Sequence, residues 1–124
     1  MDKTHSIKIN NGSFGYLKNK QSLEILKGIN FACGSGDFIG IVGLNGSGKS
    51  TLLRSLCGLL PLIKGEVLIE NIPLAQIPNN ELAKKISIVL TEKISGFNLT
   101  CYDAVAAGQL PYTNLFNKLG QHNI

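Results

Sequence analysis

Apolar and polar residues alternate over Ser6–Asn10, a pattern that is typical of a half-buried β-strand. The turn-forming residues of Asn10–Ser13 predict the end of that strand. A short extended piece over Phe14–Tyr16, a polar turn over Lys18–Ser22 and another strand over Ile29–Cys33 are expected next. Short strands that follow one another through short turns predict an N-terminal antiparallel β region.

The pattern changes after the tight turn expected at Gly34–Asp37. The apolar run Phe38–Val42 predicts a short buried strand, and Ser50–Cys57 then follows a helical period. Leucines near helical spacing predict a stripe that faces the core, made of Leu52, Leu53, Leu56, Leu59 and Leu60. Gly58 and Pro61 are stop signals for this helix.

Further elements are expected in the second half of the chain. They are a strand over Lys64–Glu70, a turn over Asn71–Pro73, a helix through Glu81–Lys85, a strand over Ile86–Leu90 and a helix over Tyr102–Ala107. Asn79 or Asn80 is the expected cap of the first of these helices. Asp103 falls in the first turn of the second helix, and Gly108 and Pro111 follow its end.

A glycine-rich loop separates the predicted strand Phe38–Val42 from the helix that follows. Its sequence, Gly-Leu-Asn-Gly-Ser-Gly-Lys-Ser over Gly43–Ser50, fits the P-loop pattern G-x-x-x-x-G-K-[ST] at every fixed position. Glycine lets successive backbone amides point inward and lets the main chain approach a polyphosphate closely. The sequence therefore predicts a nucleotide site, whose candidate residues here are Gly43, Asn45, Gly46, Ser47, Gly48, Lys49, Ser50 and Thr51.

The last two residues of the motif carry its specific chemistry. Lys49 supplies a mobile charge for the β- and γ-phosphates, and the Ser50 hydroxyl is placed to ligate Mg²⁺. The alternative is an ordinary glycine-rich turn between a strand and a helix. Such a turn has no need of lysine followed by serine, so the sequence favours a nucleotide site that also holds Mg²⁺.

Charge and composition argue against a nucleic-acid-binding function, a signal peptide and a membrane-spanning segment. With 124 residues the chain can bury one modest core, and its net charge of +4 comes from lysines spread along it. It has no block of basic residues with interleaved aromatics, so no nucleic-acid partner is expected. The polar start Met1–Ser6 does not indicate a signal peptide, and no apolar stretch approaches the ~20 residues that span a bilayer.

The cysteines and histidines do not form an evident metal site. Cys33, Cys57 and Cys101 are far apart and odd in number, which favours buried free thiols in a reducing cytoplasm. His5 and His122 have no acidic or thiol neighbours in the sequence. Metal binding by a cluster of side chains is therefore not expected.

Together these segments resemble the nucleotide-binding subunit of ABC transporters from about Ile7 to about Phe116. The resemblance rests on Leu26–Phe31 followed by Gly36-Asp37, on Asn45–Leu53, and on Gly58-Leu59 followed by Gly65–Val67. It implies an α/β fold: a P-loop NTPase core with an N-terminal antiparallel β subdomain. Residues from about 1 to 95 would form the β subdomain and P-loop core, and residues from about 96 to 124 the start of a helical subdomain.

The resemblance also implies roles for residues outside the P-loop. Tyr16 best matches the aromatic residue that stacks on adenine in this family, with Phe14 as a rival and packing of Tyr16 on the sheet as the alternative. Thr91 stands where the family has the glutamine that senses the γ-phosphate through Mg²⁺. Its hydroxyl could meet a metal-bound water, and Glu92 could offer a carboxylate, but a solvated loop explains these residues equally well.

The segment Leu99–Tyr112 resembles importer ATPases for iron-siderophore, haem and cobalamin uptake. Those proteins commonly carry Gly-Arg-x-Pro-Tyr there, and Gln109 occupies the arginine position. The resemblance implies transmembrane permease subunits and a second nucleotide-binding domain as partners. It also implies a cytoplasmic location at the inner face of the membrane, with Gly96, Phe97 and Leu99 near the coupling surface or anchoring their own loop.

The motifs that perform hydrolysis in this family do not occur in the sequence. These are the LSGGQ signature, the Walker B aspartate with its catalytic glutamate, and the switch histidine, for which His122 is no substitute. We therefore expect a domain truncated before the signature and Walker B regions, which binds ATP without efficient hydrolysis. A nucleotide-responsive binding module and a small P-loop kinase are alternatives, although a kinase lid needs arginines and the chain has only Arg54.

Overall fold

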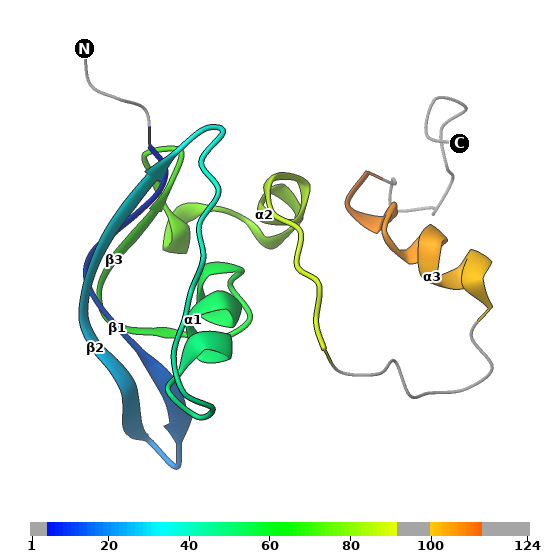
Figure 1. The fold of residues 1–124 in the computed structure, drawn as a ribbon. Helices are drawn as coiled ribbons and strands as arrows, with labels where there is room; N and C mark the ends of the chain where they lie inside the picture. Colours follow the sequence, from blue (N-terminus) through cyan, green and yellow to red (C-terminus); the bar gives the residue numbers. More distant parts are fainter. Residues whose placement is uncertain (1–4, 92–99, 113–124) are drawn as a thin grey trace. The chain divides into compact units, whose positions relative to one another are not determined.

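A four-stranded antiparallel sheet with the order β2-β1-β3-β4 organises the first part of the chain. The computed structural model describes residues 5–91 and 100–112. It divides the chain into two compact units, Met1–Pro78 and Asn79–Ile124. Figure 1 shows the sheet of the first unit with the helix α1 against one of its faces.

Strands β1 (His5–Lys18) and β2 (Gln21–Gly34) form a long hairpin. Asn19 and Lys20 connect them with φ angles of 50° and 64°. Positive φ at both central residues defines a type I′ turn, whose twist matches that of the strands it joins. The turn expected over Lys18–Ser22 is thus confirmed at Asn19 and Lys20, whereas the other three residues belong to the strands.

The strand break expected at Asn10–Ser13 is wrong, because β1 continues through these residues with a bulge. Asn11 has a φ of 48°, and its amide donates to the Asn30 side chain over 2.8 Å instead of to the ladder. A bulge accommodates turn-forming residues inside a strand by shifting the register. The register between β1 and β2 changes on both sides of Gly12.

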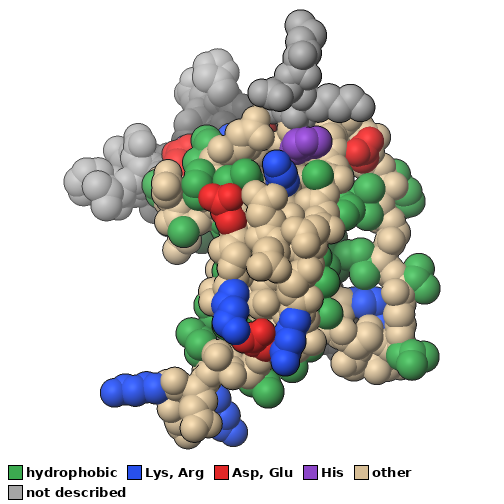
Figure 2. Space-filling view, turned by 90° about the vertical axis from the view of Figure 1, so that its left-hand side faces the viewer, with side chains coloured by type: hydrophobic (Ala, Val, Ile, Leu, Met, Phe, Trp, Pro, Cys, Tyr) green, Lys and Arg blue, Asp and Glu red, His purple; other side chains and the backbone are tan. Residues whose placement is uncertain are grey.

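The other edge of β1 pairs with β3 (Leu62–Ile69), which confirms the predicted strand. Glu70 and Asn71, with φ angles of 49° and 66°, turn the chain into the two-residue strand β4 (Ile72–Pro73). A short 3₁₀ helix, η1 (Leu74–Gln76), follows. Figure 2 shows the outer face of the sheet, where backbone and uncharged side chains fill most of the centre, charged side chains lie among them, and hydrophobic side chains lie mainly at the margins.

Helix α1 (Lys49–Leu56) confirms the helix predicted after the glycine-rich loop. Its buried residues are Thr51, Ser55 and Leu56, and the core beneath it includes Ile9, Phe14, Val67 and Ile69. The predicted stripe of five leucines is wrong in part. Gly58, with a φ of 74°, and the bond from the Leu59 amide to the Arg54 carbonyl form a Schellman ending, so Leu59 and Leu60 lie beyond the helix.

The strands predicted over Phe38–Val42 and Ile86–Leu90 are wrong, since neither segment pairs in a ladder with any described residue. Phe38 is 100% exposed and Val42 97% exposed. Continuous apolar runs are typical of strands with parallel neighbours on both sides. Within the described residues the sheet holds four antiparallel strands and offers these runs no such neighbours.

The second unit contains α2 (Asn79–Lys85), α3 (Cys101–Ala107) and the 3₁₀ helix η2 (Leu110–Tyr112). The Lys84 ammonium lies 5.6 Å from the centre of the Tyr112 ring, a cation–π contact between α2 and η2. The expected cap at Asn79 or Asn80 is wrong, because both residues lie inside the first turn of α2. The division expected near residue 95 stays a prediction.

The three cysteines, all within the described residues, are free thiols, as predicted. Their expected burial is wrong for Cys101, which is exposed, while Cys33 and Cys57 are half-buried. Burial raises the pKa of the Cys57 thiol, which favours its protonated form. Among residues 5–91 and 100–112, no helix is long and apolar enough to cross a bilayer, and no group of His, Cys, Asp and Glu could hold a metal ion.

The start of α3 gives a first testable prediction. The Thr100 hydroxyl donates to the Asp103 carboxylate over 2.6 Å, the Thr100 amide does so over 2.9 Å, and together they hold the pKa of Asp103 below its ordinary value. Thr100→Ala should raise that pKa, whereas Thr100→Ser should not. Because the pKa is depressed in the folded state, this capping box stabilises α3 above the ordinary carboxyl pKa and loses that effect as the pH falls through the depressed value. An NMR titration of the Asp103 carboxyl carbon checks both variants, and identical curves for Thr100→Ala and wild type would contradict the assignment.

Candidate nucleotide-binding site

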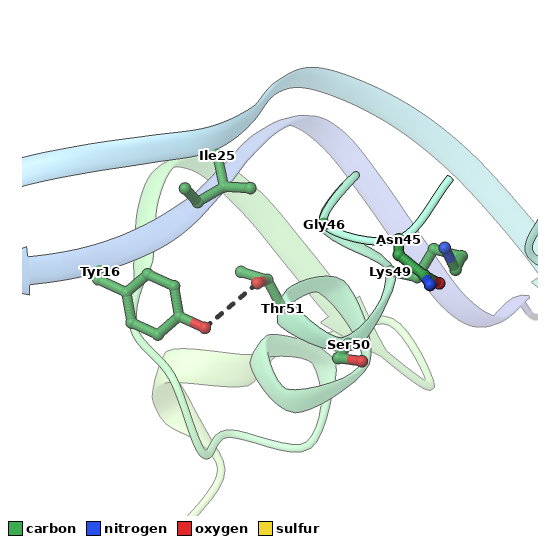
Figure 3. Close-up of a pocket in the computed structure, with 8 residues that line it drawn as sticks. Tyr16, Ile25, Asn45, Gly46, Lys49, Ser50 and Thr51 are labelled. Carbon is green, nitrogen blue, oxygen red and sulfur yellow. Dashed lines mark hydrogen bonds between the residues drawn. The ribbon is translucent and has the colours of Figure 1, made fainter. Parts of the chain in front are cut away.

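A cavity of about 340 Å³ opens between the β1–β2 hairpin and the start of α1. Its volume is within the range of small-molecule sites in proteins. The residues that line it are Tyr16, Ile25, Asn45, Gly46, Gly48, Lys49, Ser50 and Thr51. Figure 3 shows Tyr16 and Ile25 on one side of α1 and Asn45, Gly46 and Lys49 on the other. The structure thus brings Tyr16 together with most of the predicted loop residues.

The loop before α1 depends on two glycines with left-handed backbones. Gly46 has a φ of 80°, and Gly48, the N-cap of α1, has a φ of 100°. A Cβ on Gly48 would lie 3.0 Å from side-chain carbons of both Ile25 and Leu26. Glycine at this position therefore permits both the turn into the helix and the close approach of the loop to β2.

The Lys49 ammonium lies over the loop and donates to main-chain oxygens. Its Nζ is 2.6 Å from the Gly43 carbonyl, 2.7 Å from the Leu44 carbonyl and 3.4 Å from the Ser47 hydroxyl. Gly43 and Ser47 do not line the cavity themselves and instead contact this ammonium. The positive charge is thereby held beside the loop amides that would surround a phosphate.

The first turn of α1 adds further groups suited to an anion. Ser50 and Thr51 follow Lys49 directly, and this turn carries no acidic residue. The free amides and the dipole at a helix N-terminus favour negative charge. The Ser50 hydroxyl is exposed and lines the cavity, so it is available as an oxygen ligand for a hard cation such as Mg²⁺.

The end of the cavity at the hairpin is apolar and aromatic. Tyr16 is 39% exposed, and its hydroxyl lies 3.3 Å from Thr51 Oγ1. Phe14, the rival for a stacking role, is completely buried in the core. Its candidacy is therefore wrong, because a buried ring offers no face to a ligand.

Ile25 is a cavity residue that the sequence analysis missed. The register shifts between Phe14, which pairs with Leu26, and Gly15, which pairs with Glu24, so Ile25 is the unpaired residue of a bulge. A bulge re-aims a side chain and breaks the alternation of faces along the strand. No pattern within the sequence of β2 indicates this bulge.

The remaining site predictions fall in the second unit. Thr91 is exposed, and its role in metal binding stays a prediction. Glu92, Gly96, Phe97 and Leu99 lie outside the described residues.

Comparison with known proteins places these features in context. The family model for ABC transporters matches residues 26–123. An uncharacterised ABC transporter ATP-binding protein of Methanocaldococcus jannaschii is 36% identical over 117 residues, which cover 94% of this chain and 39% of that protein. A probable siderophore transport system ATP-binding protein of Bacillus subtilis is 37% identical and a hemin import ATP-binding protein of Pseudomonas putida 33% identical, each over 73% of this chain.

The chain spans 39%, 33% and 36% of the lengths of these three relatives. Among solved structures, a bacterial Atm1-family ABC exporter with ATP bound is similar with a TM-score of 0.55 and 33% identity. That similarity covers 63% of this chain and 13% of the exporter chain.

The two loop glycines give a matched test of the geometry. An alanine Cβ at Gly46 meets nothing within 4 Å. Gly46→Ala should therefore lower the free energy of unfolding only by the strain of a left-handed backbone at alanine, about 1–2 kcal/mol. Gly48→Ala should cost more, because its Cβ also crowds Ile25 and Leu26 on β2. Urea unfolding followed by circular dichroism compares the two. If Gly48→Ala lowered the free energy of unfolding no more than Gly46→Ala, the close contact between the loop and β2 would be contradicted.

Proposed function

This chain belongs to the ABC transporter family, and on that premise we propose that it is the ATP-binding part of an importer for iron-siderophore, haem or cobalamin. The family uses ATP and Mg²⁺ generally. Support for an importer comes from the relatives named for siderophore transport and hemin import. The Leu99–Tyr112 segment, which resembles such importers apart from Gln109 at their arginine position, adds to that support.

The observation that carries the proposal is the Lys49 ammonium at the mouth of a glycine loop that opens into a cavity. In the proposed complex the loop amides and Lys49 bind the β- and γ-phosphates, and the start of α1 faces the same anion. The Ser50 hydroxyl would hold Mg²⁺, which when bound neutralises charge on the phosphate oxygens. Tyr16 and Ile25 would then receive the base at the other end.

The partners and location follow from the same proposal. ATP-binding parts of importers act with permease subunits and with a second nucleotide-binding domain. We propose both as partners of this chain, at the inner face of the membrane. The Leu99–Tyr112 segment, which resembles the start of the helical subdomain of importers, is the proposed permease side, with Gly96, Phe97 and Leu99 near the coupling surface.

Hydrolysis is a separate matter from binding in this proposal. Turnover needs a carboxylate to orient water and a donor to stabilise the transferred charge. The family motifs that supply them do not occur in these 124 residues. We therefore propose that this chain, by itself, binds ATP without efficient hydrolysis.

Lys49→Ala tests binding. Loss of a charged hydrogen-bond donor to phosphate should weaken ATP affinity roughly ten- to a hundredfold, as measured by isothermal titration calorimetry with Mg²⁺. Lys64→Ala removes the same charge from an exposed residue of the same unit that does not line the cavity, and should leave the affinity unchanged. Equal affinities for wild type and Lys49→Ala would refute the proposed site.

Turnover is tested by release of inorganic phosphate from ATP. Wild-type chain should release it no faster than the Lys49→Ala variant, because the groups that activate water are not among its motifs. Substantial release that disappears in Lys49→Ala would show that this chain hydrolyses ATP without them.

A further inference from the structure

The hydrogen bond between Tyr16 and Thr51 joins the two ends of the cavity. The Tyr16 hydroxyl and Thr51 Oγ1 are 3.3 Å apart, and they connect strand β1 with the first turn of helix α1 (Figure 3). The apolar end of the cavity is thereby fastened to the helix that also carries Lys49 and Ser50.

The end of the β1–β2 hairpin that carries Tyr16 is largely exposed to solvent. Beyond Tyr16 every residue of β1 is exposed, and Leu17 and Leu23 next to the turn are exposed apolar residues. The Tyr16 residue is 39% exposed, so part of its ring lacks packing contacts that would fix its direction. A bond at the ring's far end is therefore an effective restraint on its direction.

Thr51 is itself held in place, so it can restrain the Tyr16 ring. Its side chain is buried, with 7% of the residue exposed, and its carbonyl accepts from the Ser55 hydroxyl over 2.8 Å. The residue thus belongs to the helix core, whereas its hydroxyl faces the cavity. It can hold the tyrosine hydroxyl at a fixed distance from the phosphate-binding loop.

We propose that the Tyr16–Thr51 hydrogen bond is a positioning contact, which orients the Tyr16 ring in the free protein to receive a nucleobase. The inference rests on the proposed function. A ring that is already ordered loses less conformational entropy when a base stacks on it, and this saving appears as affinity. The bond would contribute to binding of nucleotides and not to binding of a bare polyphosphate.

The test compares ATP with inorganic tripolyphosphate, both with Mg²⁺, by calorimetry on the full chain. Tyr16→Phe keeps the ring and removes the hydroxyl, and should lower ATP affinity about two- to tenfold with tripolyphosphate affinity unchanged. Thr51→Val should lower the ratio of the two affinities by the same factor. That ratio cancels any contact that Thr51 makes with phosphate.

The double variant Tyr16→Phe with Thr51→Val should lower the ratio no further than either single change, because both remove one bond. Thr51→Ser, which keeps the hydroxyl, and Tyr102→Phe, which alters an exposed tyrosine outside the cavity, should leave the ratio as in wild type. Circular dichroism verifies that each variant is folded. In the free wild type, NMR should show a nuclear Overhauser effect between the Tyr16 ring and the Thr51 methyl group, and Tyr16→Phe should weaken it.

The outcomes separate this inference from the proposed function. If wild type binds neither ATP nor tripolyphosphate, the proposed function fails and the inference fails with it. If both bind but the single variants leave the ratio unchanged, or lower it additively, the positioning role alone is overturned. A ratio lowered by Tyr16→Ala but not by Tyr16→Phe would show stacking without any contribution from the hydroxyl.

Discussion

The close approach of Gly48 to β2 is the constraint on which the candidate site depends. With no Cβ to press on Ile25 and Leu26, the chain enters α1 directly beside the hairpin. This contact places Thr51 within reach of Tyr16, and it sets the first helical turn against the apolar end of the cavity. Without it, the glycine loop and the aromatic ring would belong to separate surfaces.

Lys49 shows how such a loop can be stable before any ligand arrives. Its ammonium donates to two carbonyls at 2.6 and 2.7 Å, so the charge is already hydrogen-bonded in the free protein. A phosphate offers anionic oxygens in place of neutral carbonyls, so the ammonium would gain the attraction between opposite charges in addition to its hydrogen bonds. In the proposed complex the loop would therefore favour an anion through this exchange of partners and not through an unpaired lysine. The two carbonyls keep the Lys49 side chain near the loop.

What the sequence predicted well were features encoded within a few residues. The loop motif, helix α1 with its glycine stop, and α3 with Asp103 in its first turn all depend on local backbone chemistry. The errors have non-local causes. The bulge at Asn11 depends on a bond to Asn30 across the hairpin, and Ile25 was missed because its face is set by the register of β2. Spacing along one strand contains neither piece of information.

The two apolar runs that do not form strands also show that contacts distant in the sequence decide whether a local pattern becomes a strand. A parallel strand is stabilised by its neighbours, and within the described residues Phe38–Val42 has none. Near it, Ile39 and Ile41 join Ile9 and Leu52 around an apolar cavity of about 300 Å³. The groups of the candidate nucleotide site instead come from one hairpin and one helix within Met1–Pro78. The proposed binding of a polyphosphate would therefore use only groups that this unit holds together internally, whereas Phe38–Val42 has no neighbouring strand among the described residues.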